Sequence, residues 1–395
     1  MNRRQVLSAL TVLSTANVST RLWATPASTP RFLLVFLRGG YDCANFLVPY
    51  SSTDYYALRP HIAIARPDPK LPAGSMVLDA DWALAPAVRD SLGQLYALGQ
   101  AAFIPFAGTD DLTRSHFETQ ETIELGQPIQ DPRNPRSGFL ARLVAVLGGS
   151  TPIAFTDALP SAFQGQPDIP NISLKSAGKN VFDERQSRIL ASMYAGHGLQ
   201  GTVAEGLELR QEVSQVMKDE MASATRGALS TKGFELEAER MARLMRDQYH
   251  LGFVDVGGWD THVNQGSCTG TLAANLHNLG TGLRTYAQTL GTEWNNTIVV
   301  VVSEFGRTFR ENGNQGTDHG HGSVYWVLGG NVKGGRIVGE QVRVGVRTLF
   351  QQRDYPVFND YRAVLGGLFG RIWGLNPKQL SQVFPATIPN DLGLI

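Results

Sequence analysis

The sequence has few of the features that mark the more specialised classes of protein. Its 395 residues include only two cysteines, Cys43 and Cys268, which excludes a disulfide-rich scaffold and a four-cysteine zinc site. The 35 basic and 35 acidic residues balance, so the chain carries no electrostatic footprint for nucleic acid. Beyond the N-terminus, no segment offers the ~18–20 consecutive apolar residues that span a membrane. We therefore expect no nucleic-acid partner and no membrane span.

The N-terminus has the pattern of an export signal. Arg3 and Arg4 precede a weakly apolar stretch and then a region of small residues, as in a twin-arginine signal. We interpret residues 1–28 in this way, the alternative being a basic, irregular chain start. A twin-arginine signal predicts a periplasmic or secreted protein. In such an oxidising compartment Cys43 and Cys268 could form a disulfide.

The apolar pattern predicts an α/β fold with a mostly parallel central sheet. Five short segments are apolar without a regular polar alternation, as expected for strands that are buried on both faces. They span residues 31–37, 102–106, 251–256, 297–302 and 323–328. Segments with helical spacing lie between them, which predicts helices packed on the faces of the sheet. These segments span residues 85–98, 118–125, 138–147, 204–217, 234–244, 272–290 and 361–373.

We expect a single domain over residues 31–395. Residues 151–179 are rich in Pro, Gly, Ser and Ala, and the helical stretch that follows them carries many of the charges of the chain. We interpret residues 151–246 as an insertion or cap on the sheet. In sheets of this kind, ligands bind beyond the carboxyl ends of the strands. The residues that follow each strand are therefore the candidates for a site.

Acidic and imidazole side chains follow the predicted strands. Six of them are candidate metal ligands: Asp42, Asp260, His262, Glu304, His319 and His321. Asp260 and His262 are alternate residues of an extended loop and therefore face the same way. Carboxylate and imidazole groups together suit a divalent cation. Taken singly, each has another explanation, such as a loop cap for Asp42 or a surface ion pair between Glu304 and Arg307.

Ser115 lies near the start of a predicted helix. A serine at a helix N-terminus is close to backbone N–H groups that stabilise an anion, which suits a nucleophile attacking a phosphate or sulfate ester. Arg114 and Arg307 are candidates for stabilising the negative charge that develops. The alternative is ordinary capping, because Ser115 and Glu118 have the Ser-x-x-Glu spacing of a capping box.

In combination, these motifs resemble those of the secreted domain-of-unknown-function family 1501, over almost the whole chain from residue 31. Besides the arginine pair, the motifs are FLRGGYD at 36–42, RSH at 114–116, GGWDTH at 257–262, SEFGR at 303–307, GTDHGHG at 316–322 and DYR at 360–362. That family is grouped with the alkaline phosphatase-like superfamily of phosphatases and sulfatases. The resemblance implies a three-layer sandwich with two adjacent metals beside a nucleophile.

The resemblance also implies roles for single residues. It makes Ser115 the nucleophile, and it assigns Asp260, His262 and His321 to the first metal, with His319 as the alternative to His321. Asp42 and Glu304 would hold the second metal.

This chain departs from the superfamily at Phe305, which stands where the superfamily has a histidine. A phenyl ring cannot bind a metal. The second site would then consist of oxygen ligands, with an imidazole such as His116 as a substitute. Oxygen ligands favour calcium, magnesium or manganese over zinc, and the alternative is an empty second site. We therefore expect one or two divalent ions.

Two functions fit this pattern. The first is a metal-dependent hydrolase that acts on a small phosphate or sulfate ester. The second is a non-catalytic protein that holds a metal or an anion on a reduced hydrolase fold and assembles with another secreted envelope protein. The loss of a histidine at Phe305 motivates the second. A third alternative is an inert α/β domain in which the motifs serve only as caps and loops.

Overall fold

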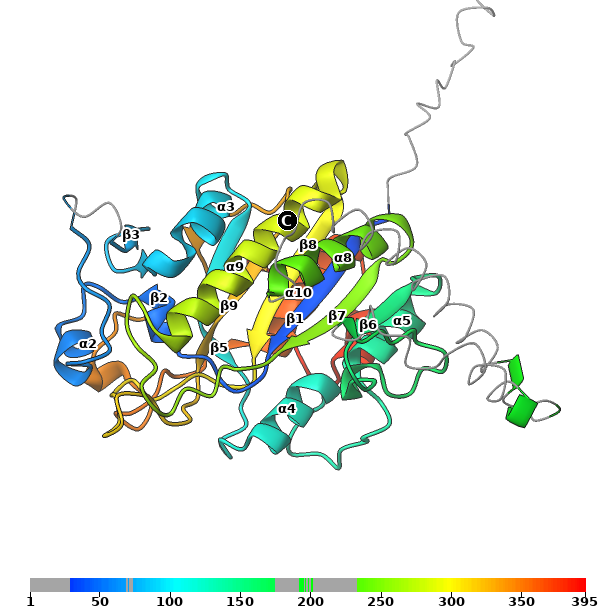
Figure 1. Ribbon diagram of the computed structural model, residues 1–395. Coiled ribbons are helices and arrows are strands. Elements are labelled where there is room, and N and C mark those ends of the chain that lie inside the picture. The colour runs from blue at the N-terminus through cyan, green and yellow to red at the C-terminus, as the bar shows by residue number, and fades with distance from the viewer. Residues whose placement is uncertain are drawn as a thin grey trace, which may run out of the picture.

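A mixed β-sheet forms the centre of the computed structural model (Figure 1). The structure describes residues 29–68, 70, 74–174 and 233–395, with a few single positions between 192 and 201. The strand order is β10-β5-β9-β8-β1-β7-β6, with β11 paired to β5. Every pairing in this sheet is parallel except those of β9 with β5 and β8. The predicted mostly parallel α/β fold is confirmed.

All five strands predicted from the sequence form. They are β1 (Arg31–Leu37), β5 (Ala101–Gly108), β7 (Leu251–Val256), β8 (Thr297–Ser303) and β9 (Ser323–Leu328). The sheet is completed by β6 (Pro152–Phe155), β10 (Arg336–Ile337) and β11 (Asn359–Asp360). A separate antiparallel sheet contains β2 (Leu47–Val48), β3 (Met76–Val77) and β4 (Ala83–Leu84).

Alternate residues of β1 contribute to two different layers of the core. Leu33 and Val35 belong to one buried apolar cluster, whereas Phe32 and Leu34 belong to the other. Side chains of a strand point alternately to its two faces, so a strand covered on both faces must be apolar throughout. This burial explains why the strand segments show no polar alternation.

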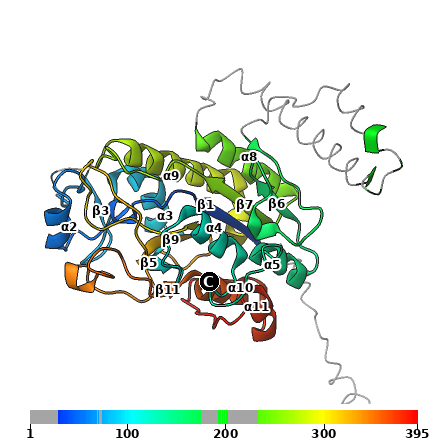
Figure 2. The same ribbon diagram turned by 90° about the horizontal axis from the view of Figure 1, so that it is seen from below.

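Helices cover both faces of the sheet, as the three-layer expectation requires. One face is covered by α3 (Gln94–Ala97), α8 (Phe234–Asp247) and α9 (Thr271–Leu290). The other is covered by α5 (Phe139–Leu147), α10 (Tyr361–Trp373) and α11 (Pro377–Val383). Figure 2 shows α8 and α9 on one side of the strands and α10 and α11 on the other. Between the layers, α4 (His116–Leu125) lies at the edge where the parallel strands end (Figure 1).

Some helices differ from the prediction. The stretch 85–98 is not one helix but a 3-10 turn at Pro86–Val88, a π-helical turn at Arg89–Gly93 and α3. Two further helices, α11 and α2 (Thr53–Leu58), were not predicted, because they are too short to show periodicity. The residues that could have indicated these two helices are their N-caps, Ser52 and Asn376. The side chain of each accepts a backbone N–H of the first helical turn. The helix predicted at 204–217 lies outside the described residues.

The ends of the predicted insertion belong to the sheet domain. β6 pairs in parallel with β7, and α8 packs against α9. Most of the segment between β6 and α8, from 175 to 232, lies outside the described residues, so a cap there remains a prediction. The predicted signal at 1–28 lies outside them as well. Within the described residues, no helix has the length and apolar character needed to cross a membrane.

Candidate metal centre

Three histidines and one aspartate converge at the carboxyl edge of the sheet. Asp260 and His262 follow β7, His319 lies in the loop before β9, and His116 is the first residue of α4. The Nε2 atoms of His262, His319 and His116 lie 2.9, 3.2 and 3.6 Å from the Asp260 carboxylate. In a tetrahedral site with metal–ligand bonds of ~2.0–2.1 Å, neighbouring donors lie about 3.3 Å apart. The spacings from Asp260 are close to this value, and the group of described side chains whose donor atoms all lie within 4.8 Å of one another consists of His116, Asp260 and His319.

The other ring nitrogen of each histidine faces a hydrogen-bond acceptor. These Nδ1 contacts are His116 with Glu304 Oε1 at 2.8 Å, His319 with the Arg114 carbonyl at 3.0 Å and His262 with Asp318 Oδ1 at 3.3 Å. A carbonyl and an ionised carboxylate only accept hydrogen bonds, so each Nδ1 is the protonated donor. Each Nε2 then offers a lone pair toward the Asp260 carboxylate, as in second-shell-oriented metal ligands.

Two features of the cluster are accounted for by a cation between the donors. His116 Nε2 is buried and makes no hydrogen bond, although buried nitrogens are normally satisfied. The Nε2 atoms of His262 and His319 lie 3.1 Å apart, a spacing that a cation bound to both nitrogens would account for. Burial also lowers the pKa of His319, which favours the neutral, metal-binding form. The donor set therefore fits a divalent ion.

Arg307 holds the aspartate of the cluster. Its buried guanidinium donates to Asp260 Oδ1 at 2.7 Å and to the Thr317 carbonyl at 2.8 Å. Burial acts to raise the pKa of Asp260, but the hydrogen bond and positive charge of Arg307 outweigh it, so the pKa is lowered. Arg307, predicted to stabilise developing charge on a substrate, has its guanidinium in contact with Asp260, and its role toward a substrate stays a prediction. The guanidinium keeps Asp260 ionised and fixes its direction.

Glu304 likewise contacts a ligand rather than joining the donors. Its buried Oε1 accepts from His116 Nδ1, from Gln120 Nε2 at 2.9 Å and from the Gly39 backbone N–H at 2.7 Å. The hydrogen bond to Glu304 in turn raises the pKa of His116. The structure therefore places Glu304 as the group that orients His116, which the sequence had offered only as a substitute ligand.

Glu304→Gln tests this orienting role. We expect the substitution to weaken metal binding by roughly 10- to 100-fold, the usual effect of losing an outer-shell partner of a ligating histidine. Competition with a chromogenic chelator would measure it. Glu340→Gln, at an exposed carboxylate, is the matched control and should bind as the wild type does. Equal affinity in the two variants would contradict the assignment.

Phe305 forms a wall of the cluster. Its ring centroid lies 5.0 Å from those of both His116 and His319, and its side chain is buried. A Cβ placed on Gly40, which has φ of +64°, would lie 2.4 Å from the Phe305 ring. The loop after β1 therefore needs glycine at this position to pass the aromatic side chain.

Ser115 is the N-cap residue of α4 and immediately precedes His116. Its backbone is extended, but its side chain makes no capping hydrogen bond, so the capping box with Glu118 does not form. No hydrogen bond of its hydroxyl occurs in the part of the chain that the structure describes. The hydroxyl is thus left available at a helix N-terminus beside the cluster.

Two further predicted residues lie differently from expectation. The Arg114 guanidinium forms an ion pair with Asp354 at 2.8 Å. The backbone of Arg114 has a φ of +54°, and its carbonyl oxygen contacts Nδ1 of His319. His321 packs against Phe350 with ring centroids 5.1 Å apart, and burial lowers its pKa to about 4. His319, rather than His321, therefore reaches the cluster, because His319 forms a β-bridge with Arg307.

Asp42 is paired inside the core. Both of its oxygens contact the Arg59 guanidinium, at 2.5 and 3.0 Å, and Oδ2 also accepts from Gln265 at 2.6 Å. Arg59 is fully buried. Asp42 belongs to no group of metal-binding side chains among the described residues. The predicted role of Asp42 as a ligand to a second metal therefore gains no support, since its charge is already neutralised.

Arg59→Met is expected to destabilise the fold strongly. It would leave the Asp42 carboxylate buried without a partner, which typically costs ~3–5 kcal/mol. Urea denaturation would measure the free energy of unfolding. The double variant Arg59→Met, Asp42→Leu should recover much of the loss, because it removes both charges. A single variant as stable as the wild type would show that the pair is not isolated from water.

The two cysteines do not form the disulfide considered above. Cys43 is buried, Cys268 is exposed, and both are free thiols.

Comparison with known proteins identifies the family. The family model described as "Protein of unknown function (DUF1501)" matches residues 29–384. The chain belongs to this family. A search of curated proteins found no match.

Solved structures show distant similarity to this family member. One is a protein of the alkaline phosphatase superfamily from Vibrio parahaemolyticus, with 13% identity over 83% of this chain and 69% of the other, and a TM-score of 0.33. Another is the zinc complex of the C-terminal periplasmic domain of EcEptC from Escherichia coli, with 8% identity over 76% and 73%, and a TM-score of 0.37. A third is the phosphonate monoester hydrolase of Agrobacterium radiobacter, with 12% identity over 88% and 74%, and a TM-score of 0.37. Likenesses this weak carry no argument about the activity of the chain.

A cavity of about 870 Å³ lies beside α4, and none of the residues of the cluster lines it. It is lined by α4, by residues 157–161, by the start of α8 and by the loop after β7. Gln120 lines the cavity and also donates to Glu304. Phe117, another lining residue, directly follows His116. Gln120 and Glu304 therefore lie between the lining of this cavity and the imidazole of His116.

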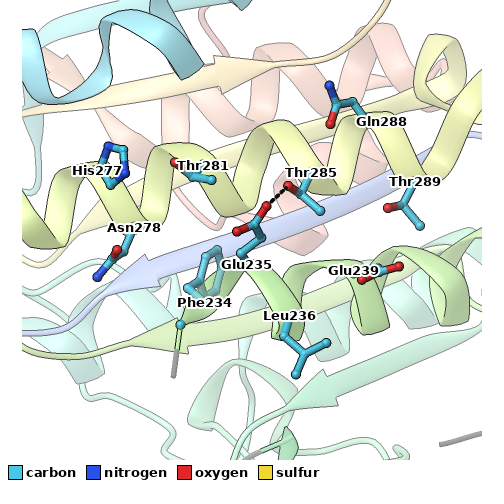
Figure 3. Close-up of a pocket in the computed structure, with 11 residues that line it drawn as sticks. Phe234, Glu235, Leu236, Glu239, His277, Asn278, Thr281, Thr285, Gln288 and Thr289 are labelled. Carbon is cyan, nitrogen blue, oxygen red and sulfur yellow. Dashed lines mark hydrogen bonds between the residues drawn. The ribbon is translucent and has the colours of Figure 1, made fainter. Parts of the chain in front are cut away.

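A second cavity, of about 480 Å³, lies between α8 and α9 (Figure 3). Its lining is mostly polar, and Glu235 of α8 accepts a hydrogen bond from Thr285 of α9 at 2.9 Å. None of the predicted site residues lines it. We therefore assign the chemistry to the cluster at the carboxyl edge of the sheet.

Proposed function

We propose that this protein is a metal-dependent hydrolase of phosphate or sulfate esters. The observation that carries the proposal is the convergence of three imidazole Nε2 atoms on the Asp260 carboxylate, directly beside a serine at a helix N-terminus. A centre of this composition suits zinc better than calcium, magnesium or manganese, which prefer oxygen ligands. His116, Asp260, His262 and His319 would hold the ion.

The residues around the cluster have separate tasks. Ser115 is the nucleophile: its hydroxyl oxygen bonds to the phosphorus or sulfur of the ester, the P–O or S–O bond to the alcohol breaks, and the alcohol leaves with the proton that the serine gives up. Water then hydrolyses the serine-bound group, which releases phosphate or sulfate and restores the hydroxyl. The backbone N–H groups of the first turn of α4 stabilise the negative charge of the bound group. Glu304 and the Arg114 carbonyl hold two imidazoles in the tautomer that binds, and Arg307 keeps Asp260 ionised. A bound divalent ion would supply a Lewis acid that neutralises charge on the ester group.

The cluster supports one ion rather than two. Asp42 is neutralised by Arg59, Glu304 is used by His116, and Phe305 offers no lone pair. Of the two-metal ligand set that the family resemblance implied, too few donors remain for a second ion. We therefore propose a single-ion site.

We also propose that the protein acts outside the cytoplasm. The support is the arginine pair at Arg3 and Arg4 and the small-residue region up to residue 28. Fusion of residues 1–28 to a reporter whose export depends on the twin-arginine pathway would test it. Loss of export on changing both arginines to lysine is expected.

The proposed activity can be tested on a panel of aryl phosphate, phosphonate and sulfate esters. The protein should be loaded in turn with zinc and manganese, and release of the phenol measured. We expect turnover of at least one ester class that disappears on chelation and returns with the ion. Absence of turnover across the panel, in protein shown to contain one ion per chain, would refute it.

A binding or assembly role is the second candidate. The observation that favours it is the single-ion ligand set, because in-line displacement often relies on two ions. An ion would then raise the stability of the fold by mass action without any chemistry. A metal-dependent rise in melting temperature together with inert behaviour on the ester panel would support this candidate, and co-purification with an envelope protein would extend it.

A further inference from the structure

We infer that Gln265 and Thr317 are positioning residues of the proposed metal centre. They hold the guanidinium of Arg307, and through it the ligand Asp260, by a chain of hydrogen bonds that starts at the buried carboxylate of Asp42. This inference rests on the metal centre of the proposed function and not on the hydrolysis of an ester.

Each step of the chain is a hydrogen bond between buried residues. Gln265 Nε2 donates to Asp42 Oδ2 at 2.6 Å. At the other end of the same amide, Gln265 Oε1 lies 3.0 Å from Thr317 Oγ1 and 3.1 Å from Thr261 Oγ1. Thr317 Oγ1 in turn accepts from Arg307 Nε at 3.2 Å. Gln265 and Thr317 are fully buried, and Asp42 and Arg307 are 1% and 3% exposed, so solvent does not compete for these contacts.

The carboxylate of Asp42 sets the direction of the hydrogen bonds in the chain. A carboxylate paired with an arginine, as Asp42 is with Arg59, only accepts, so the amide of Gln265 turns its NH2 group toward it. The amide oxygen then faces Thr317 and also only accepts. The Thr317 hydroxyl therefore donates to it and keeps its lone pairs for the Nε–H of Arg307. The reverse orientation of the amide would place two acceptors face to face at Asp42.

Thr317 fixes the plane of the Arg307 guanidinium with two of its atoms. Its hydroxyl accepts from Nε, and its backbone carbonyl accepts from Nη2 at 2.8 Å. With Nε and Nη2 both engaged, the planar group directs Nη1 at Asp260 Oδ1, which lies 2.7 Å away. Loss of the hydroxyl would leave Nε buried without its acceptor, and the guanidinium would turn to find another. The direction of the Asp260 carboxylate therefore depends on the hydroxyl of Thr317.

Thr317→Val tests the inference, because it removes the hydroxyl and keeps the shape of the side chain. We expect zinc affinity, measured by competition with a chromogenic chelator, to fall roughly 10-fold, at the low end of the effect of losing an outer-shell partner. Thr317→Ser, which retains the hydroxyl, should bind zinc as the wild type does.

Thr297→Val is the matched control for Thr317→Val. Thr297 is equally buried, and its hydroxyl donates to the Glu293 carbonyl at 2.8 Å. It begins β8, whose other end leads to the cluster. Its zinc affinity should equal that of the wild type, although loss of the hydroxyl lowers the stability of the fold. Destabilisation alone is thereby separated from an effect on the metal centre.

A second variant tests whether the two residues act through one chain. Gln265→Met removes the amide and retains the length of the side chain, and it should weaken zinc binding in the same direction as Thr317→Val. Because both act through the guanidinium of Arg307, the double variant should lose no more affinity than the weaker-binding single variant. Losses that add would show that the two residues act separately, and would overturn the inference.

The outcomes separate this inference from the proposed reaction, because none of the measurements uses ester turnover. Zinc affinity in Thr317→Val equal to that of the wild type, or Thr317→Ser as weak as Thr317→Val, would overturn the inference and leave the proposed hydrolase standing. The expected affinities in a protein that cleaves no ester would support the inference and count against the proposed reaction. A wild type that binds no zinc would refute the metal centre and the inference together.

Discussion

His319→Ala should abolish stoichiometric metal binding. The substitution removes one of four converging donors and the ring that lies between Arg114 and Asp260. Loss of a first-shell ligand should weaken binding by more than the roughly 10- to 100-fold that follows loss of an outer-shell partner. Elemental analysis after dialysis would show about one ion per chain for the wild type and a small fraction of that for the variant.

Thermal unfolding gives a second measurement of the same variant. An ion present at 100 times its dissociation constant stabilises the fold by ~2.7 kcal/mol, so chelation should lower the melting temperature of the wild type. The variant, already without its ion, should not respond. His277→Ala, at an exposed histidine in the other cavity, is the matched control. Full metal content in His319→Ala would exclude this cluster as the binding site.

Ser115→Ala should reduce kcat on the best ester substrate by at least ~10³-fold. An enzyme that has lost its nucleophile keeps only the small rate enhancement that substrate binding and charge stabilisation provide. Metal content and melting temperature should stay as in the wild type, since the hydroxyl makes no capping bond that the substitution would remove. Steady-state kinetics with elemental analysis of the same preparation would measure both.

Ser381 provides the control for this variant. Ser381→Ala removes an exposed hydroxyl of α11 and should leave kcat within a few-fold of the wild type. If Ser115→Ala retained most of the activity while metal removal abolished it, a water molecule rather than the serine would be the nucleophile. Mass spectrometry of the rapidly quenched reaction should detect the covalent intermediate on Ser115 in the wild type.

The strands and the edge of the sheet that carries the site were predictable from the sequence. Both follow from local features, because a strand such as β8 is apolar over its whole length and ligand sites lie at the ends of such strands. Edge elements were harder to predict. β6 is only four residues long and lies in a region rich in proline and glycine, so its pairing with β7 decides its structure.

Which side chains meet at the site depended on contacts that are distant in the sequence. Asp42 follows a strand, as a ligand would, but a buried Arg59 from α2's C-terminal end takes both of its oxygens. His116 was expected only as a substitute ligand of a second metal, because its contact with Glu304 joins residues 188 positions apart. His319 and His321 are equivalent by spacing, and only the β-bridge to Arg307 distinguishes them. Pattern alone could give the residue types but not these partners.

The ion pair between Asp42 and Arg59 limits what a change at position 305 can do. Phe305→His would add an imidazole, but the carboxylate of the loop after β1 would stay neutralised by a guanidinium in the core. Removing Arg59 alone would leave a buried charge, which destabilises the fold. A new metal site at this place would therefore need changes at both positions together.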